Sequence, residues 1–148
     1  MILIGYHYNM KSGLITRNTD YAVRALVFMA RREKRSVSVS ELVRELKIPR
    51  PFLRNIMQTL GQKGILKSSR GKRGGFIFAV QPGKIFLTDL MRIFQGALKI
   101  NECIFKKMVC PNKKTCSLRK ELCEIEDLVI TRLKNINLLF LAKRGRGL

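Results

Sequence analysis

Four cysteines lie close together in the last third of this 148-residue chain, which has no others. They are Cys103, Cys110, Cys116 and Cys123. The first three have six and five residues between them, a spacing too wide for the C-x-x-C knuckle of a zinc finger. Three thiolates on one flexible loop can instead wrap a cluster of several iron atoms, because soft sulfur ligands suit iron–sulfur chemistry. The sequence therefore predicts a local metal or redox site, with free thiols or zinc as alternatives.

The residues around these cysteines are mostly basic. Four lysines beside the first three thiols would offset the negative charge of a thiolate-ligated cluster: Lys106, Lys107, Lys113 and Lys114. The one histidine, His7, is near the N-terminus, and we expect it to be a bystander. Cys123 stands apart among charged residues of both signs. It could be a fourth ligand, a redox reserve or a plain surface cysteine.

The whole chain carries a large positive charge, with 30 Lys and Arg against 10 Asp and Glu, a net +20. Residues 1–75 hold 16 basic and 4 acidic groups, so the excess leans towards the N-terminal half. Such a surface favours a polyanionic partner, either nucleic acid or an anionic membrane. The hydrophobic content of 46% excludes disorder of the whole chain. Since no secretion signal or membrane span is expected, the reducing cytoplasm is the predicted location.

Apolar side chains at helical spacing predict a first helix over 16–32 and a short second helix that begins near Ser40. Ser38 and Glu41 have the spacing of a capping box for the second helix. Pro51 is well placed as the first residue of a third helix. The expected buried residues of this third helix are Phe52, Leu53, Ile56, Met57 and Leu60.

Two strands, over 65–68 and 76–80, are expected to follow, joined by a glycine-rich basic turn at 70–75. Three helices and a basic hairpin form the order of a winged helix-turn-helix domain, which we place at 14–83. The predicted fold class is therefore mainly α with a small β-hairpin. Residues 1–13 are expected to form a disordered extension.

The remaining chain predicts a further helix around 86–94 and a cysteine-rich loop, which together fill 84–117. An apolar seam then predicts one helix of about six turns over 118–142, followed by a basic tail at 143–148. The seam comprises Leu118, Leu122, Ile125, Val129, Leu133, Ile136 and Phe140. Because no other segment is left to cover this seam, we expect the helix to pair with its mate in a two-fold homodimer.

The candidate DNA contacts lie on the third helix and on the hairpin turn. Arginine can fork onto guanine and Asn or Gln can pair with adenine, which suits Arg50, Arg54, Asn55 and Gln58. The turn residues suit phosphates or a narrow minor groove, and they are Arg70, Lys72 and Arg73. The simpler alternative is that these charges only solvate the surface. Their clustering favours contact with double-stranded DNA.

Three motifs in this order resemble the Rrf2 family of bacterial winged-helix regulators. The segments 16–26, 48–53 and 69–76 are similar to the family's opening, recognition helix and wing, and the resemblance covers about 14–140. It implies that Arg70 enters the minor groove. It also implies that Cys103, Cys110 and Cys116 hold a two-iron or four-iron cluster before the dimerisation helix.

The resemblance leaves the fourth cluster ligand open. IscR-like members have a histidine soon after the third cysteine, whereas Ser117, Leu118, Arg119 and Lys120 stand there in this chain. NsrR-like members use an aspartate of the opposite subunit, and Asp20 occupies the matching position. Asp20 is therefore the first choice and Cys123 the second. The simpler explanation of Asp20 is a carboxylate that stabilises the start of a helix.

The function implied is a sequence-specific transcriptional regulator, bound to a pseudo-palindromic operator, whose DNA affinity follows the state of an iron–sulfur cluster. The cluster would sense nitric oxide, redox state or iron and sulfur status. A thiol- or zinc-controlled repressor without a cluster is the alternative within regulation. An iron–sulfur electron carrier or enzyme is the alternative of another class, but the chain has no convincing catalytic constellation, and we expect no enzyme. A membrane partner is disfavoured because no basic amphipathic helix lies at an end.

Overall fold

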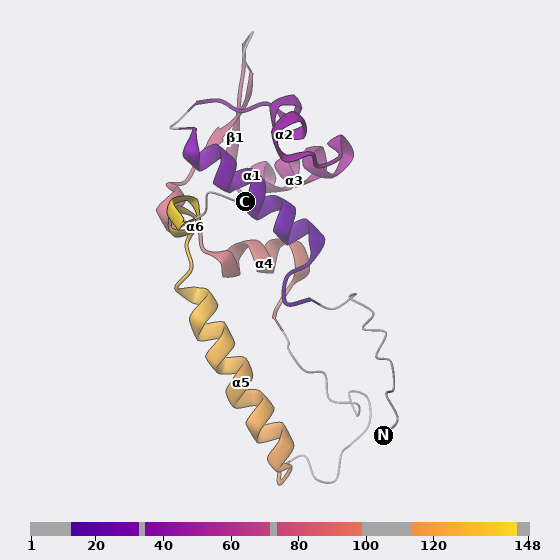
Figure 1. The fold of residues 1–148 in the computed structure, drawn as a ribbon, viewed down its shortest axis with the longest axis vertical. Coiled ribbons are helices and arrows are strands. Elements are labelled where there is room, and N and C mark those ends of the chain that lie inside the picture. Colours follow the sequence, from indigo (N-terminus) through magenta and orange to yellow (C-terminus); the bar gives the residue numbers. More distant parts are fainter. Residues whose placement is uncertain (1–12, 33–34, 72–73, 99–113, 145–148) are drawn as a thin grey trace, which may run out of the picture.

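The computed structural model describes residues 13–32, 35–71, 74–98 and 114–144 of the chain. The elements form a body of helices and one hairpin, from which one long helix extends (Figure 1). The predicted extension at 1–13 lies almost wholly outside the described residues. In chain order the elements are α1 (Arg17–Arg31), α2 (Val39–Leu46), α3 (Arg50–Gln62), β1 (Leu66–Ser69), β2 (Gly75–Phe78), η1 (Pro82–Lys84), α4 (Leu87–Gln95), α5 (Ser117–Lys134) and α6 (Leu138–Arg144).

Each of the first three helices begins at a residue type that suits a helix start, either a capping hydroxyl or a proline. Thr16 caps α1 by accepting a hydrogen bond from the Thr19 amide, and Ser38 caps α2 by accepting one from the Glu41 amide at 3.1 Å. The Glu41 carboxylate pairs with the Arg35 guanidinium. Lys47 ends α2 in a left-handed conformation, with φ of 56°, and Pro51 lies in the first turn of α3. The predicted order of three helices is confirmed.

The core lies between α1, α3, α4 and the hairpin. On α3 the buried stripe is Leu53, Ile56, Met57 and Leu60, as predicted. The prediction for Phe52 is wrong, because its side chain remains 42% exposed. One helical step rotates a residue by about 100°, which places Phe52 at the edge of the stripe. There its ring meets the edge of Tyr21, with the two ring centroids 6.0 Å apart.

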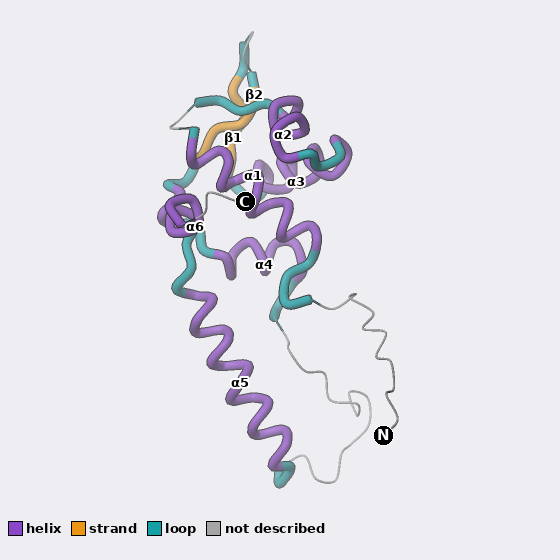
Figure 2. The backbone as a smooth tube through the Cα atoms, in the orientation of Figure 1, coloured by secondary structure: helices purple, strands orange, loops and turns teal. Residues whose placement is uncertain are grey.

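The hairpin pairs β1 with β2 in antiparallel register, from Leu66 opposite Phe78 to Ser69 opposite Gly75. Its strands match the predicted ones within two residues. The segment between α1 and α2 adds a third partner, since Val37 and Phe76 exchange two backbone hydrogen bonds of 3.0 and 2.9 Å. This bridge attaches the hairpin to the helices (Figure 2).

The predicted single helix over 118–142 is in fact two helices. The chain leaves helical geometry at 135–137, and the backbone there bonds to the segment that precedes α4. The Leu87 amide donates to the Ile136 carbonyl and the Leu138 amide to the Ile85 carbonyl, both at 2.8 Å. After this break α6 folds back onto α1, and it continues to Arg144, two residues into the predicted basic tail.

Asn137 caps α6, because its Oδ1 accepts a hydrogen bond from the Phe140 amide at 2.8 Å. Replacing Asn137 with Ala should lower the free energy of unfolding by about 0.5–2 kcal/mol, since the first turn of α6 loses its cap. Asn137→Asp keeps the acceptor oxygen and should retain most of the stability. Urea unfolding of the three proteins measures this. Equal losses in both variants would contradict the capping role.

Candidate DNA-binding surface and cysteine site

The four predicted DNA contacts on α3 share one exposed face of that helix. Arg50, Arg54 and Gln58 follow each other at four-residue spacing, Asn55 lies beside Arg54, and all four side chains are exposed. Burial of the opposite stripe against the core fixes which way these side chains point. The Arg50 guanidinium bonds to the Ser40 hydroxyl of α2. With the exposed Arg70 of the hairpin, these four residues are called the reading face below.

The hairpin turn contributes Arg70, which directly follows β1 and is exposed. The other two predicted contacts of the turn, Lys72 and Arg73, lie outside the described residues. The sequence suggested that the turn glycines let the backbone approach DNA. The structure gives Gly75 a second reason, because a Cβ atom there would lie 2.5 Å from the Val37 carbonyl oxygen. Glycine is thus required for the backbone bridge that holds the hairpin.

Two of the four cysteines are described, and both lie near the start of α5. Cys116 immediately precedes the helix and is partly buried, whereas Cys123 lies two turns further on and is exposed. Seven residues of helix advance by about 10 Å, which is beyond the Cα separation of a disulfide. These two thiols therefore do not pair with each other while the helix is intact. Cys103 and Cys110 lie outside the described residues.

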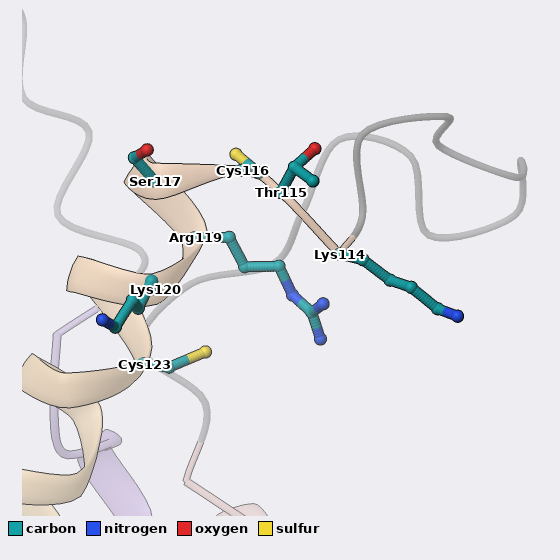
Figure 3. A pocket seen from close by; sticks show the side chains of 7 residues that line it. All are labelled: Lys114, Thr115, Cys116, Ser117, Arg119, Lys120 and Cys123. Atoms are coloured by element: carbon teal, nitrogen blue, oxygen red, sulfur yellow. The ribbon is translucent and has the colours of Figure 1, made fainter.

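Cys116 and Cys123 line one hollow of about 270 Å³ at the start of α5. Figure 3 shows Arg119 between them along the helix, with its side chain extending to the same side as that of Cys123. The full lining is Lys114, Thr115, Cys116, Ser117, Arg119, Lys120 and Cys123. Thiol donors beside three cations fit the chemistry of an anionic iron–sulfur cluster. Within the described ranges, no three His, Cys, Asp or Glu residues come together as a metal site.

Asp20 lies in the first turn of α1, and its carboxylate is engaged within its own helix. Oδ2 accepts a hydrogen bond from Nε of Arg24 at 2.8 Å, and both side chains are about two-fifths exposed. A ligand role towards a second subunit would require the carboxylate to be shared with, or released from, Arg24.

The hollow at Cys116 and the reading face lie at opposite ends of the molecule. In Figure 1 the start of α5 is the point furthest from α2, α3 and the hairpin. Within one subunit, Cys116 and Cys123 therefore lie far from the side chains of the reading face.

Gln95, at the end of α4, is a polar residue that joins distant segments and that no sequence motif indicated. Its Oε1 accepts from the Thr16 amide at 3.0 Å and from the Thr19 hydroxyl at 2.8 Å. Its Nε2 donates to the Leu14 carbonyl at 3.0 Å. The partners are 76 to 81 residues away in sequence, so no local pattern could have revealed them.

Comparison with known proteins decides the family. The model of the family described as Rrf2, iron-dependent transcriptional regulator, matches residues 15–144. The chain belongs to the Rrf2 family. This membership confirms the resemblance and the predicted absence of enzyme activity, because the Rrf2 family is one of transcriptional regulators. The family and the named relatives are regulators and not enzymes, so the alternative of an iron–sulfur enzyme has no support from them.

Individual members of the Rrf2 family match this chain over part of its length, with moderate or low sequence identity. A protein of Aquifex aeolicus named as an HTH-type transcriptional regulator is 39% identical over 90 residues, which cover 61% of this chain and 62% of that relative. NsrR of Bacillus subtilis is 28% identical over 112 residues, covering 74% of this chain and 77% of NsrR. The matched segment thus spans about three-fifths of the Aquifex protein and about three-quarters of NsrR.

Solved structures share the fold. CymR, the global cysteine regulator of B. subtilis, superposes with a TM-score of 0.75 at 21% identity, covering 88% of this chain and 97% of CymR. IscR of T. potens gives a TM-score of 0.68 at 22% identity, covering 87% and 85%. The winged-helix fold class is confirmed. In the part of the chain that the structure describes, no helix has the length and apolar character needed to cross a membrane.

The close approach at Gly75 can be tested by stability. Gly75→Ala should lower the free energy of unfolding by about 1–3 kcal/mol, because the added methyl group overlaps the Val37 carbonyl. Gly61→Ala is the matched control, since a Cβ atom at that helical position meets nothing within 4 Å. It should be neutral or stabilising by about 0.5–1 kcal/mol. Thermal unfolding of both variants decides, and a harmless Gly75→Ala would refute the steric argument.

Proposed function

We propose that this Rrf2 protein is a dimeric, sequence-specific DNA-binding regulator whose DNA affinity follows the state of an iron–sulfur cluster. The reading face carries the DNA-binding part of the proposal. Two arginines and two amides of this face project from α3 and are of types that pair with base edges, while the opposite side of α3 is buried in the core. A regulator that binds the chromosome would act in the cytoplasm, where its thiols stay reduced.

The dimer part of the proposal rests on α5. This helix leaves large apolar side chains in solvent, with Leu118 68%, Ile125 52% and Leu128 72% exposed. Exposed apolar area of this kind on one helix is typical of an interface. A second copy related by two-fold symmetry would cover it and place two reading faces on two half-sites of a pseudo-palindromic operator.

The cluster part of the proposal assigns Cys103, Cys110 and Cys116 as ligands, with Asp20 of the opposite subunit as the fourth and Cys123 as second choice. When bound, a two-iron or four-iron cluster would supply iron that reacts with nitric oxide or oxidants and is lost when iron is scarce. The protein's own contribution is to hold thiolates beside Lys114, Arg119 and Lys120, whose charge favours the anionic ligands. Asp20 would connect one subunit's α1 to the other's cysteine loop.

A thiol-controlled regulator without a cluster is the second candidate. The observation in its favour is that Cys123 is exposed and lines the same hollow as Cys116, so the two thiols share one cationic environment. Since they are too far apart to pair, oxidation would join either one to another cysteine or to a small thiol. Zinc bound by the same thiols remains the variant of this candidate.

The DNA-binding proposal is tested by Arg54→Ala on the reading face. We expect the variant to lose about 1–3 kcal/mol of binding free energy on its operator, which is roughly 5- to 150-fold in Kd. Arg92→Ala, on the exposed side of α4, removes the same charge away from the reading face and should change Kd by less than about threefold. Fluorescence anisotropy at fixed salt measures both. Equal losses of affinity in the two variants would mean that Arg54 acts only through the net charge of the protein.

The cluster proposal is tested by purification without air, iron and sulfide analysis, and a visible spectrum. Cys116→Ala should abolish the cluster absorption, whereas Cys123→Ala should retain it if Asp20 is the fourth ligand. A colourless wild-type protein with reactive thiols would instead support the thiol-controlled candidate.

The role of Asp20 needs its own control because of the ion pair with Arg24. Asp20→Ala should destabilise the cluster, while Arg24→Gln breaks the ion pair but leaves the carboxylate and should keep the cluster. If Asp20→Ala keeps a normal cluster, the assignment moves to Cys123.

A further inference from the structure

Gln95 joins the end of α4 to the start of α1 by three hydrogen bonds. Its amide oxygen accepts from the Thr16 backbone and the Thr19 hydroxyl, and its amide nitrogen donates to the Leu14 carbonyl. Thr19 is fully buried, and its hydroxyl oxygen also lies 3.1 Å from that of Thr16. A buried hydroxyl of this kind requires a partner, which Gln95 provides. These three bonds are called the Gln95 clamp below.

The clamp uses both ends of a primary amide. Two of its bonds need an acceptor and one needs a donor, and the Gln95 amide supplies these on separate atoms, Oε1 and Nε2. A glutamate could accept the first two bonds but could not donate to Leu14. A leucine has nearly the same size and can make none of the three. The clamp can therefore be removed in steps without opening a large cavity.

The Gln95 clamp joins the segment that precedes the cysteine loop to the start of α1. Gln95 is the last residue of α4 and is followed by Gly96, with φ of 82°; in the sequence, Cys103 comes eight residues after Gln95. On the other side, Thr19 directly precedes Asp20, whose own amide bonds to the Thr16 carbonyl at 2.9 Å. The root of the cysteine loop is thus attached to the turn of α1 that carries Asp20.

From α1, close packing continues to α3, the helix that carries most of the reading face. α1 packs on α3 as well as on α4 and α6, and its buried side chains belong to the same core as Leu53 and Met57. A close-packed core transmits a shift of one helix to its neighbours because it leaves no space to absorb the shift. A displacement at the start of α1 therefore bears directly on the helix that carries Arg54.

We infer that Gln95 is the positioning residue through which the state of the cysteine loop reaches the DNA-binding helices. The inference rests on the proposed function, since it needs a cysteine loop whose state changes. It adds to that function the physical link, an amide clamp between the loop's root and α1. Gln95 itself contacts neither DNA nor any cysteine in this proposal.

The test measures coupling, defined as the ratio of operator Kd values for cluster-free and cluster-loaded protein. Coupled sites typically show ratios of about 5- to 150-fold, in either direction. Gln95→Leu should bring the ratio to within about twofold of one, with normal cluster absorption and a lowered unfolding temperature that still leaves the protein folded at the assay temperature. Gln95→Glu keeps the two acceptor bonds and should retain an intermediate ratio. A merely structural residue would change both Kd values together and leave their ratio intact.

A second measurement does not depend on the cluster. The Thr16 amide is protected by Gln95, so in cluster-free Gln95→Leu its hydrogen exchange should be about 2- to 10-fold faster than in wild type. Gln81→Leu is the matched control, an exposed glutamine beside η1 and away from the clamp. It should keep both the wild-type ratio and the wild-type exchange rate.

The outcomes separate the inference from the proposed function. A wild-type ratio of one would refute the cluster-controlled function and, with it, the inference. A large wild-type ratio that survives in Gln95→Leu would refute the inference alone. An equal loss of coupling in Gln81→Leu would also overturn it, because the effect would then not belong to the clamp.

Discussion

The close packing of α1 is the constraint on which the other elements depend. Ala22 and Ala25 on this helix are completely buried, and their small side chains let neighbouring backbones approach. α3, α4 and α6 all pack on α1, although the sequence separates them widely. The position of α1 consequently helps to set the positions of α3, which carries most of the reading face, of the end of α4 and of the C-terminal helix α6. A change at either end of α1 cannot remain local.

Both ends of α1 are fixed by hydrogen bonds to remote parts of the chain. At its start the Gln95 amide holds Thr16 and Thr19. At its end the Arg31 side chain donates to the Ala142 carbonyl of α6 at 3.1 Å. Since α6 follows α5 after the break at 135–137, the far end of α1 is connected to the helix that begins directly after Cys116. The helix that carries the cysteine hollow, α5, is therefore connected to α1 in two ways. It packs on α4, which packs on α1, and it is followed in the chain by α6, which also packs on α1.

The parts of this structure that sequence could predict are those written in neighbouring residues. The cap at Ser38, the proline in α3 and the stripe from Leu53 to Leu60 are all local patterns, and each lies where expected. The helix break at 135–137 was missed because its hydrogen bonds come from Ile85 and Leu87, about fifty residues earlier. Gln95 and the bridge between Val37 and Phe76 were missed for the same reason. On the candidate site, residue types predicted an exposed face on α3, whereas the assignment of metal ligands depends on a second subunit and on residues 99–113.

The reading face and the cysteine hollow are both rich in positively charged side chains. The three described ion pairs are at least partly exposed, and such pairs contribute little to stability. With 30 basic and 10 acidic residues, carboxylates of the chain cannot neutralise most of its positive charge. The reading face and the cysteine hollow both collect this charge, at opposite ends of the body. Salt screens the repulsion between exposed charges that lie more than about 10 Å apart. The coupling proposed above would therefore run through packed helices and the hydrogen bonds that fix the ends of α1.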